Sequence, residues 1–530
     1  MLSVLLVLMV LSPLAATLPI AFWRGDLRGP RVIALVATIF SLVCAIVIAA
    51  NFVESFKGPS VNWTWLSADG IHFQLGIDGI SLWLVVLTAL LSVTAVLVSW
   101  DAVREKTRAF YALLLLLETG MLGVFVAQDI ILFYVFFEFT LIPLFFLIGI
   151  WGSPEQRQLA ARKFFIYTFT GSVLTFLGLV YIVIAYSNPD SLNFSIPALT
   201  ESAAADSCTD TPQISARVQW WLFVALLAGF AIKVPLFPFH TWLPLAHVEA
   251  PTAGSVLLAG VLLKIGTYGF LRFSLPLLPD ASHAFVGLIA VLSVIGIIYG
   301  ALVALAQDDI KRLVAYSSLS HLGFCMLGLF TLNEIGMSGG LLQCVNHGLT
   351  TGALFAMVGM LYERYHTREI SSFGGLAHKM PLLTFFFLVI TLASIGLPGL
   401  NGFVGEFLVL VAVFQNGSYA LGAIAALGII LGAFYMLWLI QRIFFGPLKE
   451  PAHDHPVSDL NAREVLTLAP ITAICLWIGL FPNFFLEPMA RDIQSTALTL
   501  QRASSVTVVP NDAAVVQTTS MLTSNKDLRR

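Results

Sequence analysis

Four ionisable side chains lie inside long apolar stretches of this sequence, and they are two acids and two bases: Glu138, Lys233, Lys264 and Glu406. A charged side chain at the centre of a lipid bilayer costs about 2.5 to 3.5 kcal/mol, so each is expected to face a partner. A buried lysine loses its hydration, whereas a nearby carboxylate favours its charged form. Moving Glu138 relative to Lys233 would therefore load or unload a proton, and the four charges predict a proton path.

Four histidines in apolar or aromatic surroundings extend this predicted path: His240, His247, His321 and His347. An imidazole accepts and donates a proton near neutral pH, which suits a relay position. The alternative for each is a core histidine that is hydrogen-bonded to a backbone carbonyl. His321 and His347 favour the relay interpretation most, because both fall within predicted membrane helices where water is scarce.

Other charged residues have a weaker claim to a role in proton transfer. Glu118, in LLLLLETGMLG, is a buried acid that either feeds protons inward or only hydrogen-bonds to a neighbouring helix. Charges at the ends of apolar runs are expected to be solvated or interfacial. These residues are Asp129, Glu249, Asp308, Asp309, Lys311 and Arg312.

For the four central charges, the alternative to a proton path is a set of salt bridges that hold helices together. Replacing a buried ion pair by apolar packing is often neutral or stabilising. Four buried charges in one chain therefore favour a functional role.

The elements that position these charges must be membrane helices. Of the 530 residues, 58% are hydrophobic and 11% are charged, and the mean hydropathy is +0.90. Apolar runs of about twenty residues indicate helices, because backbone groups in lipid must bond internally. The net charge of -3 gives no indication of nucleic-acid binding. The five cysteines show no CxxC pair and no spacing typical of an iron-sulfur cluster or zinc site.

Apolar runs between polar or Pro/Gly-rich breaks predict about fourteen transmembrane helices. They lie near residues 2–22, 32–52, 80–99, 109–127, 130–151, 164–186, 219–239, 254–276, 284–305, 313–331, 337–362, 381–413, 419–445 and 465–484. The first run lacks a basic n-region, so it is predicted to be a retained helix and not a cleaved signal.

The distribution of basic residues orients these helices. With the N-terminus outside, 17 of the 27 Lys and Arg residues fall in inner loops, as the positive-inside rule requires. They are Arg24, Arg28, Arg31, Arg104, Lys106, Arg108, Arg157, Arg162, Lys163, Lys311, Arg312, Arg364, Arg368, Lys379, Arg442, Lys449 and Arg463. The N-terminus is therefore predicted to lie on the periplasmic or lumenal side.

Two of the predicted helices are interrupted at corresponding positions. One contains Pro235 and Pro238, and the other contains Gly396 and Pro398. A proline frees backbone groups, which is tolerated at membrane depth only in a protein-lined or wet interior. Each proline alone could merely kink a packed helix. Together they predict two five-helix units, each broken in its fourth helix, and an odd number of helices makes the units inverted repeats.

The predicted fold is thus an all-α integral membrane protein of about fourteen helices with two inverted five-helix repeats. Its expected parts are three N-terminal helices, a first repeat (helices four to eight), a second repeat (helices nine to thirteen), the fourteenth helix with its flanks, and a polar flexible tail. Their boundaries are 1–105, 106–278, 279–447, 448–494 and 495–530. The polar segment 187–218 is expected to be an outer loop.

Four segments resemble the antiporter-like, proton-translocating subunits of complex I. They are AIKVPLFPFHTWLPLAHVEAPTAGSVLLAGVLLKIGTYGFLRF, AYSSLSHLGF, NHGLTTGALFAMVGMLYERYHTR and SIGLPGLNGFVGEF. The resemblance covers roughly residues 75–485, and the sequence there is most similar to the chain M or chain 4 family. It implies a fourteen-helix fold with two inverted repeats.

The resemblance implies roles for the central residues. Glu138 matches the glutamate of helix five, Lys233 the lysine of helix seven, Lys264 the lysine of helix eight and Glu406 the acid of helix twelve. The helix-twelve position of these subunits is Lys in some members and Glu in chain M. Glu406 therefore supports the resemblance to the chain M or chain 4 family. The polar-axis histidines of the family match His240, His321 and His347, and Glu118 resembles its helix-four acid.

The implied mechanism is redox-driven proton pumping, in which this chain carries no cofactor. Flavin, iron-sulfur clusters and quinone are expected in partner subunits. The expected partners are other antiporter-like subunits, small membrane subunits and lipids, in a hetero-oligomer without nucleic acid.

Two other functions remain open from the sequence. They are a Mrp-type sodium/proton antiporter subunit and a membrane subunit of an energy-converting hydrogenase or formate hydrogenlyase. A third, a non-conducting scaffold, is disfavoured because all four positions of the buried charges are filled. The sequence also leaves open whether the electron donor is NADH, NADPH or ferredoxin. It does not decide whether the membrane is a bacterial plasma membrane or a thylakoid membrane. The general character of the polar C-terminal tail favours a cyanobacterial, plastoquinone-linked complex.

Overall fold

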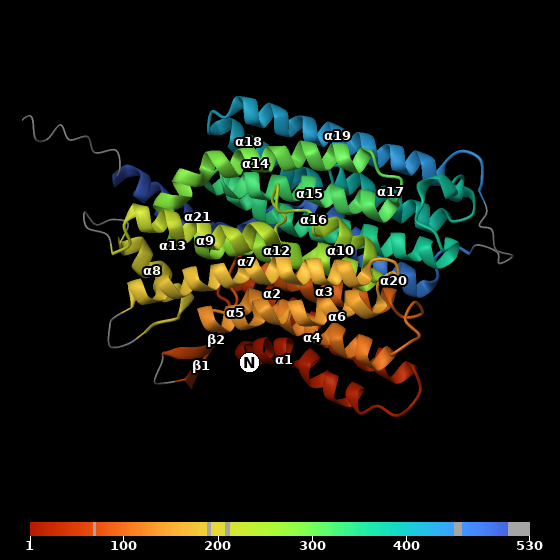
Figure 1. Ribbon diagram of the computed structural model, residues 1–530, viewed down its shortest axis with the longest axis horizontal. Coiled ribbons are helices and arrows are strands. Elements are labelled where there is room, and N and C mark those ends of the chain that lie inside the picture. Colours follow the sequence, from red (N-terminus) through yellow and green to blue (C-terminus); the bar gives the residue numbers. More distant parts are fainter. Residues whose placement is uncertain (67–69, 188–191, 207–212, 450–457, 507–530) are drawn as a thin grey trace, which may run out of the picture.

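The computed structural model shows a mainly helical membrane protein. It describes residues 1–66, 70–187, 192–206, 213–449 and 458–506. Long helices run side by side along one axis and form a bundle (Figure 1). Eleven helices of the described part are long and apolar enough to cross a membrane. Three further spans are shorter or more polar. They are α3 (Leu82–Val98), α15 (Ile310–Leu329) and the broken span formed by α17 (Pro381–Ser394) and α18 (Asn401–Gln415). Together these helices match the fourteen predicted spans.

The N-terminal part adds a hairpin to its membrane helices. Its elements before α3 are α1 (Leu2–Ala21), α2 (Arg28–Ser55), β1 (Ser60–Leu66) and β2 (Ile71–Gly76). The hairpin is absent from the sequence-based prediction. Its antiparallel strands place Trp63 opposite Phe73, with ring centroids 5.7 Å apart. Such aromatic cross-strand pairs stabilise a two-stranded sheet.

The first repeat begins with α4 and contains the first broken helix. Its elements are α4 (Thr107–Val126), α5 (Ile130–Phe139), α6 (Leu141–Trp151), α7 (Arg157–Tyr186), α8 (Ile196–Asp206), α9 (Ala216–Lys233), α10 (Leu243–Glu249), α11 (Thr252–Leu257), η2 (Leu258–Leu262), α12 (Leu263–Gly269), η3 (Phe270–Ser274) and α13 (Leu275–Leu277). The predicted break separates α9 from α10. The helix that bears Glu138 also divides at Thr140, because Pro143 has no N–H to donate to the Phe139 carbonyl.

The second repeat has the same plan. Its elements besides α15, α17 and α18 are α14 (Pro279–Leu305), α16 (Glu334–Tyr365), η4 (Ile370–Ser372), η5 (Leu376–His378) and α19 (Tyr419–Phe444). The predicted break lies between α17 and α18, where Gly396 and Gly399 have φ of +74° and +91°. A backbone with positive φ suits glycine, so these residues end one half-helix and start the next.

Two predictions for polar segments are wrong in part. The expected outer loop at 187–218 contains α8, and the expected flexible tail from residue 495 continues as helix. The last elements are α20 (Ala462–Leu480) and α21 (Asn483–Val506). A stripe of Phe485, Met489, Ile493, Ala497 and Leu500 is buried in α21, and this three-to-four-residue spacing forms one helix face. Residues 507–530, His453 and His455 lie outside the described residues.

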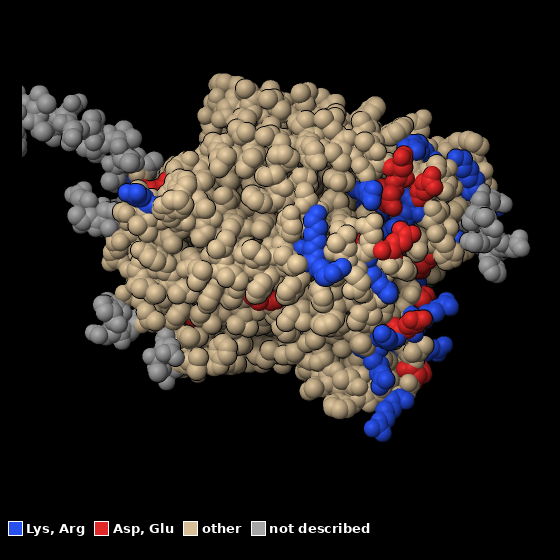
Figure 2. Space-filling model, viewed as in Figure 1, with Lys and Arg blue, Asp and Glu red and all other residues tan. Residues whose placement is uncertain are grey.

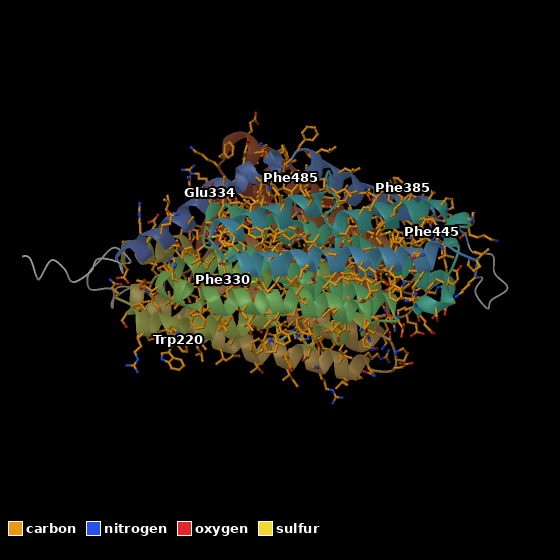
Figure 3. The ribbon with its side chains drawn as sticks, turned by 90° about the horizontal axis from the view of Figure 1, so that it is seen from above. Trp220, Phe330, Glu334, Phe385, Phe445 and Phe485 are labelled. Atoms are coloured by element: carbon orange, nitrogen blue, oxygen red, sulfur yellow. The ribbon has the colours of Figure 1, made fainter. Side chains whose placement is uncertain are left out.

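The charged residues gather at one end of the bundle, on the right in Figure 2. Contacts tie the loops of this charged end together: Arg31 Nη2 donates to the Val103 carbonyl, and Trp151 Nε1 donates to the Glu105 carbonyl. Figure 3 shows Phe330, at the end of α15, toward the opposite end from Phe445, which follows α19. The helices therefore run between a charged end and a less charged end.

Candidate functional site

Lys264 and His347 form the centre of the site. Lys264 is on α12 and His347 is on α16, and their side chains are 0% and 2% exposed. The membrane-spanning windows of these two segments are wholly buried inside the bundle. Lys264 Nζ lies 2.6 Å from His347 Nδ1 and also donates to the Ala259 carbonyl. A charged Lys264 requires Nδ1 to accept, so the imidazole proton then lies on Nε2.

The backbone around Lys264 departs from a regular α-helix. The π-helical turns η2 and η3 precede and follow α12. Such turns in a membrane helix are frequent at functional sites, because they free carbonyls and shift the side-chain direction. The Ala259 carbonyl, which accepts from Lys264, belongs to η2. The irregular turn thus supplies an acceptor for the buried ammonium group.

His321 and Glu406 continue the series from α15 to α18. The rings of His347 and His321 have centroids 5.8 Å apart. His321 Nδ1 lies 3.0 Å from Glu406 Oε1, and both side chains are buried. His321 Nε2 is 3.4 Å from the Ser394 hydroxyl at the end of α17. The second helix break therefore borders the acid end of this series.

Several polar residues that are missing from the sequence-based prediction surround Glu406. Gln343 Nε2 donates to Glu406 Oε1 over 3.0 Å, and Asn346 Nδ2 donates to Gln343 Oε1 and to the Asn401 carbonyl. Tyr435 is fully buried near the same carboxylate. The amides in LLQCVNHGL could have been noticed as polar groups in an apolar run, as His347 was. Tyr435 gives no such signal, because a tyrosine in a membrane helix is ordinary.

Lys233 and Glu138 lie at the first break but do not touch. Lys233, the last residue of α9, is 2% exposed, and its ammonium nitrogen is 4.6 Å from the centre of the Phe137 ring. Glu138 lies beside Ser172 and within electrostatic range of Lys233. The described ion pairs with N–O distances up to 4.0 Å do not include this pair. The two charges are neighbours without a fixed salt bridge.

The first break also approaches the central lysine. A side chain on Gly266 of α12 would lie 2.6 Å from the Phe230 carbonyl of α9. Gly266 is two residues after Lys264, and Phe230 is three residues before Lys233. The missing Cβ lets the two lysine-bearing helices pack backbone to backbone.

The remaining predicted residues lie at the sides of this series. Glu118 on α4 is 0% exposed, and neither carboxylate oxygen has a hydrogen-bond partner among the described residues. His240 packs between Phe237 and Tyr299, with ring centroids 5.6 Å and 5.2 Å away. His247 stacks on the ring of Phe355 at 4.8 Å. Among the described residues, Glu118 and His240 make no hydrogen bond with the central series, and His247 packs against α16, the helix that bears His347.

The expectation of solvated charges at the span ends is wrong for three residues. Asp129 is buried and caps α5 by accepting from Ile131 N and Leu132 N. Glu249 and Lys311 are 6% and 7% exposed. Helix packing encloses these positions although they end apolar runs, because loops of the bundle fold back over them.

The central series consists of side chains that can bind and release protons. Along the series, the ammonium group of Lys264 donates, the imidazoles of His347 and His321 can each donate and accept, and the carboxylate of Glu406 accepts. Within the described residues, no cluster of three or more His, Cys, Asp or Glu side chains is placed to hold a metal. A proton can therefore pass along the series by exchange between adjacent groups.

Comparisons with known proteins identify the family of the chain. Residues 127–432 match the family described as "NADH:quinone oxidoreductase/Mrp antiporter, TM". NADH-quinone oxidoreductase subunit M of Rickettsia typhi is 44% identical over 459 residues, which are 86% of this chain and 89% of the relative.

Two solved structures have a similar fold. One is a chain of respiratory complex I from Thermus thermophilus, with a TM-score of 0.83, 31% identity and coverage of 93% of this chain and 99% of that one. The other is a chain of the Mrp complex from Dietzia sp. DQ12-45-1b, with a TM-score of 0.80, 20% identity and coverage of 95% and 99%. The second likeness concerns the fold alone.

The family match spans more than half of the chain, and the Rickettsia relative shares its sequence along most of both lengths. The chain belongs to the NADH:quinone oxidoreductase/Mrp antiporter membrane family, within its group of complex I subunit M proteins.

Proposed function

We propose that this chain is a non-redox subunit that carries protons across the membrane, driven by quinone reduction in other subunits. The observation that carries the proposal is the buried series from Lys264 to Glu406, in which Lys264 Nζ is 2.6 Å from His347 and His321 is 3.0 Å from Glu406. A static packing role would be served as well by apolar side chains. Proton transfer explains why titratable groups occupy these positions.

Each central residue has a proposed role. Lys233 is the switchable carrier and Glu138 is its modulating partner. Because no close ion pair fixes them, a small helix movement changes their interaction strongly. Lys264 and His347 are the central relay, and Glu406 is the gate of the outer half beside the second helix break.

The secondary residues have supporting roles in the proposal. His321 links the relay to Glu406, and His247 and His240 lie toward the first break. Glu118 lies apart from the series as an accessory acid.

The redox chemistry is proposed to occur outside this chain. Flavin, iron-sulfur clusters and quinone belong to partner subunits, as the scattered cysteines of this sequence suggest. The proposed neighbours are other antiporter-like subunits, small membrane subunits and lipids. Exposed apolar side chains on α1, α2 and α19, such as Leu18, Val36 and Ile430, suit such membrane contacts.

The proposed orientation places the charged end on the cytoplasmic side and the N-terminus on the other side. The proposed location is the bacterial plasma membrane, with NADH as the electron donor of the whole complex. The relatives are subunits of NADH-quinone oxidoreductases, which favours NADH and a quinone over the ferredoxin and plastoquinone of a thylakoid complex.

Proton pumping by the whole complex in proteoliposomes tests the proposal. Lys233→Ala and Glu138→Gln are expected to lower pumping and coupled quinone reduction at least tenfold, whereas Lys57→Ala, in an exposed loop, keeps both. Assembly of each variant is checked by the amount of intact complex. Normal pumping by both Lys233→Ala and Glu138→Gln would leave these charges with a structural role only.

Sodium/proton antiport is a second candidate, because the fold is also that of a chain from a Mrp complex. The same vesicles distinguish the two functions. Redox-driven pumping is expected to need no sodium, whereas an antiporter exchanges sodium for protons without quinone reduction.

A further inference from the structure

A polar cavity opens at the charged end of the bundle, on the side where the first and second repeats meet. Its volume is about 220 Å³. It lies between the loop after α6 and the end of α16, and its wall includes Trp151, Ser153, Thr252, Lys311, Tyr362 and Arg368. No residue of the central series lines this cavity.

Lys311 is the unusual residue of this wall. Its side chain is buried, and Nζ donates to the carbonyls of Ala250 and Val248 over 2.5 Å and 3.3 Å. Its ammonium group has no carboxylate within 4.0 Å among the described residues, because Asp309 pairs instead with Arg368 Nε at 3.3 Å. A buried ammonium group held only by neutral carbonyls gives up a proton more easily than a solvated one.

The other charges near Lys311 come from three segments. Asp309 and Glu249 attract its charge, and Arg368 repels it. Glu249 is buried, and its Oε2 atom has no hydrogen-bond partner in the described part of the chain. Arg368 Nη1 donates to the same Val248 carbonyl as Lys311, over 2.6 Å. Lys311 therefore sits among opposing charges without a fixed partner.

His247 lies behind this wall, toward the centre. It is fully buried, and neither of its ring nitrogens has a hydrogen-bond partner among the described residues. The carbonyl of the next residue, Val248, accepts from Lys311, and the His247 ring stacks on Phe355 of α16, the helix that also bears His347. An imidazole with both nitrogens free can accept at one and donate from the other. His247 thus lies between the cavity and the central relay.

We infer that this cavity is the inner mouth of the proton path, with Lys311 as its first carrier and His247 as the link to Lys264. The inference rests on the proposed function. Lys311 releases a proton from Nζ to water or to His247, and it regains one from the water of the cavity. His247 takes the proton at one nitrogen and releases the other to Lys264, so no charge accumulates at the link.

A structural role is the competing explanation for Lys311. Lysine side chains near the C-terminus of a helix bind its last carbonyls, and Val248 and Ala250 end α10. Arginine keeps the charge and the donors but does not release its proton at neutral pH. Lys311→Arg therefore separates a carrier from a cap.

The test uses the whole complex in proteoliposomes. Lys311→Arg and His247→Phe are expected to lower redox-driven pumping about tenfold, because phenylalanine keeps the stack on Phe355 and removes only the nitrogens. The matched control is Lys449→Arg, since the exposed Lys449 also donates to a backbone carbonyl, that of Ser371, over 2.7 Å. Its pumping is expected to equal that of the parent.

A second measurement depends less on folding of the variants. Thr252→Cys places a thiol in the cavity wall, and a cationic methanethiosulfonate reagent added from the charged side is expected to block pumping. The same reagent on Ser371→Cys, which is exposed outside the cavity, is expected to have no effect.

The outcomes separate the two proposals. Loss of pumping in Lys233→Ala, with normal pumping in Lys311→Arg, His247→Phe and labelled Thr252→Cys, overturns the inner mouth and leaves the proposed function intact. Normal pumping in Lys233→Ala and Glu138→Gln as well would overturn the proposed function itself. Loss in Lys311→Met with normal pumping in Lys311→Arg makes Lys311 a cap and also overturns the inference.

Discussion

The carboxylate of Glu406 is held by groups from two other helices. Oε1 lies 3.0 Å from His321 Nδ1 and accepts from Gln343 Nε2 over the same distance. A hydrogen bond to a charged group contributes about 1.5 to 3 kcal/mol, which is more than a neutral one. The amide of Gln343 therefore helps to hold the Glu406 carboxylate in place beside His321.

This contact leads to a prediction at the residue scale. Gln343→Leu removes the amide donor with little change in volume and is expected to slow coupled quinone reduction roughly tenfold, the effect of about 1.4 kcal/mol on a barrier. Gln158→Leu is the control, because the amide of Gln158 donates to the Gly149 carbonyl outside the series. Steady-state rates with and without an uncoupler measure the effect. Equal rates for Gln343→Leu and the parent would show that Glu406 works without this donor.

The broken helices place charged groups where a regular helix could not. Lys233 ends one half-helix, and Glu406 lies in the half-helix that follows the second break. A Cβ added to Gly396 would lie 3.0 Å from Glu406 Oε2. The glycine at this break thus combines a left-handed backbone with direct contact to the acid.

A pair of glycine variants separates these two effects at the scale of the element. Gly396→Ala and Gly417→Ala place alanine at φ of +74° and +73°, and both are expected to destabilise the complex by roughly 1 to 2 kcal/mol. Nothing lies within 4 Å of a Cβ at Gly417, so only Gly396→Ala is expected to reduce pumping. Thermal stability and pumping are measured on the same preparations. A similar loss of pumping in both variants would show that backbone strain alone causes the loss.

The whole molecule separates its charges along the membrane normal. On the face shown in Figure 2, Lys and Arg gather at the charged end, whereas the opposite end carries the hairpin and α8 (Figure 1). Between the two ends, the segments that bear Lys264 and His347 are enclosed by lipid-facing helices. The bundle thereby shields a polar interior from lipid, which is the requirement for a proton path at membrane depth.

Orientation is the prediction at this scale. Ser371→Cys at the charged end is expected to react with a membrane-impermeant maleimide in inside-out vesicles, and Ser60→Cys, in the hairpin, in right-side-out vesicles. Both positions are exposed, so accessibility alone does not bias the result. The parent protein gives the background labelling. The reverse pattern would place the charged end outside the cytoplasm and contradict the positive-inside orientation.

Much of the fold and part of the site follow from local features of the sequence. A charge in an apolar run identifies Glu138, Lys233, Lys264 and Glu406, and prolines and glycines identify both helix breaks. α21 is less visible, because its buried stripe lies among polar residues that resemble a tail.

Local patterns in the sequence were enough to predict the membrane fold, the broken helices and the types of the buried groups, because lipid allows few ways to satisfy a backbone or a charge. Which of these groups meet became known only from the packing of the helices. Lys264 and His347 are 83 residues apart, His321 and Glu406 are 85 apart, and Lys311 is buried by segments distant in sequence. Such contacts depend on how helices pack side by side, which the pattern of a single helix does not contain.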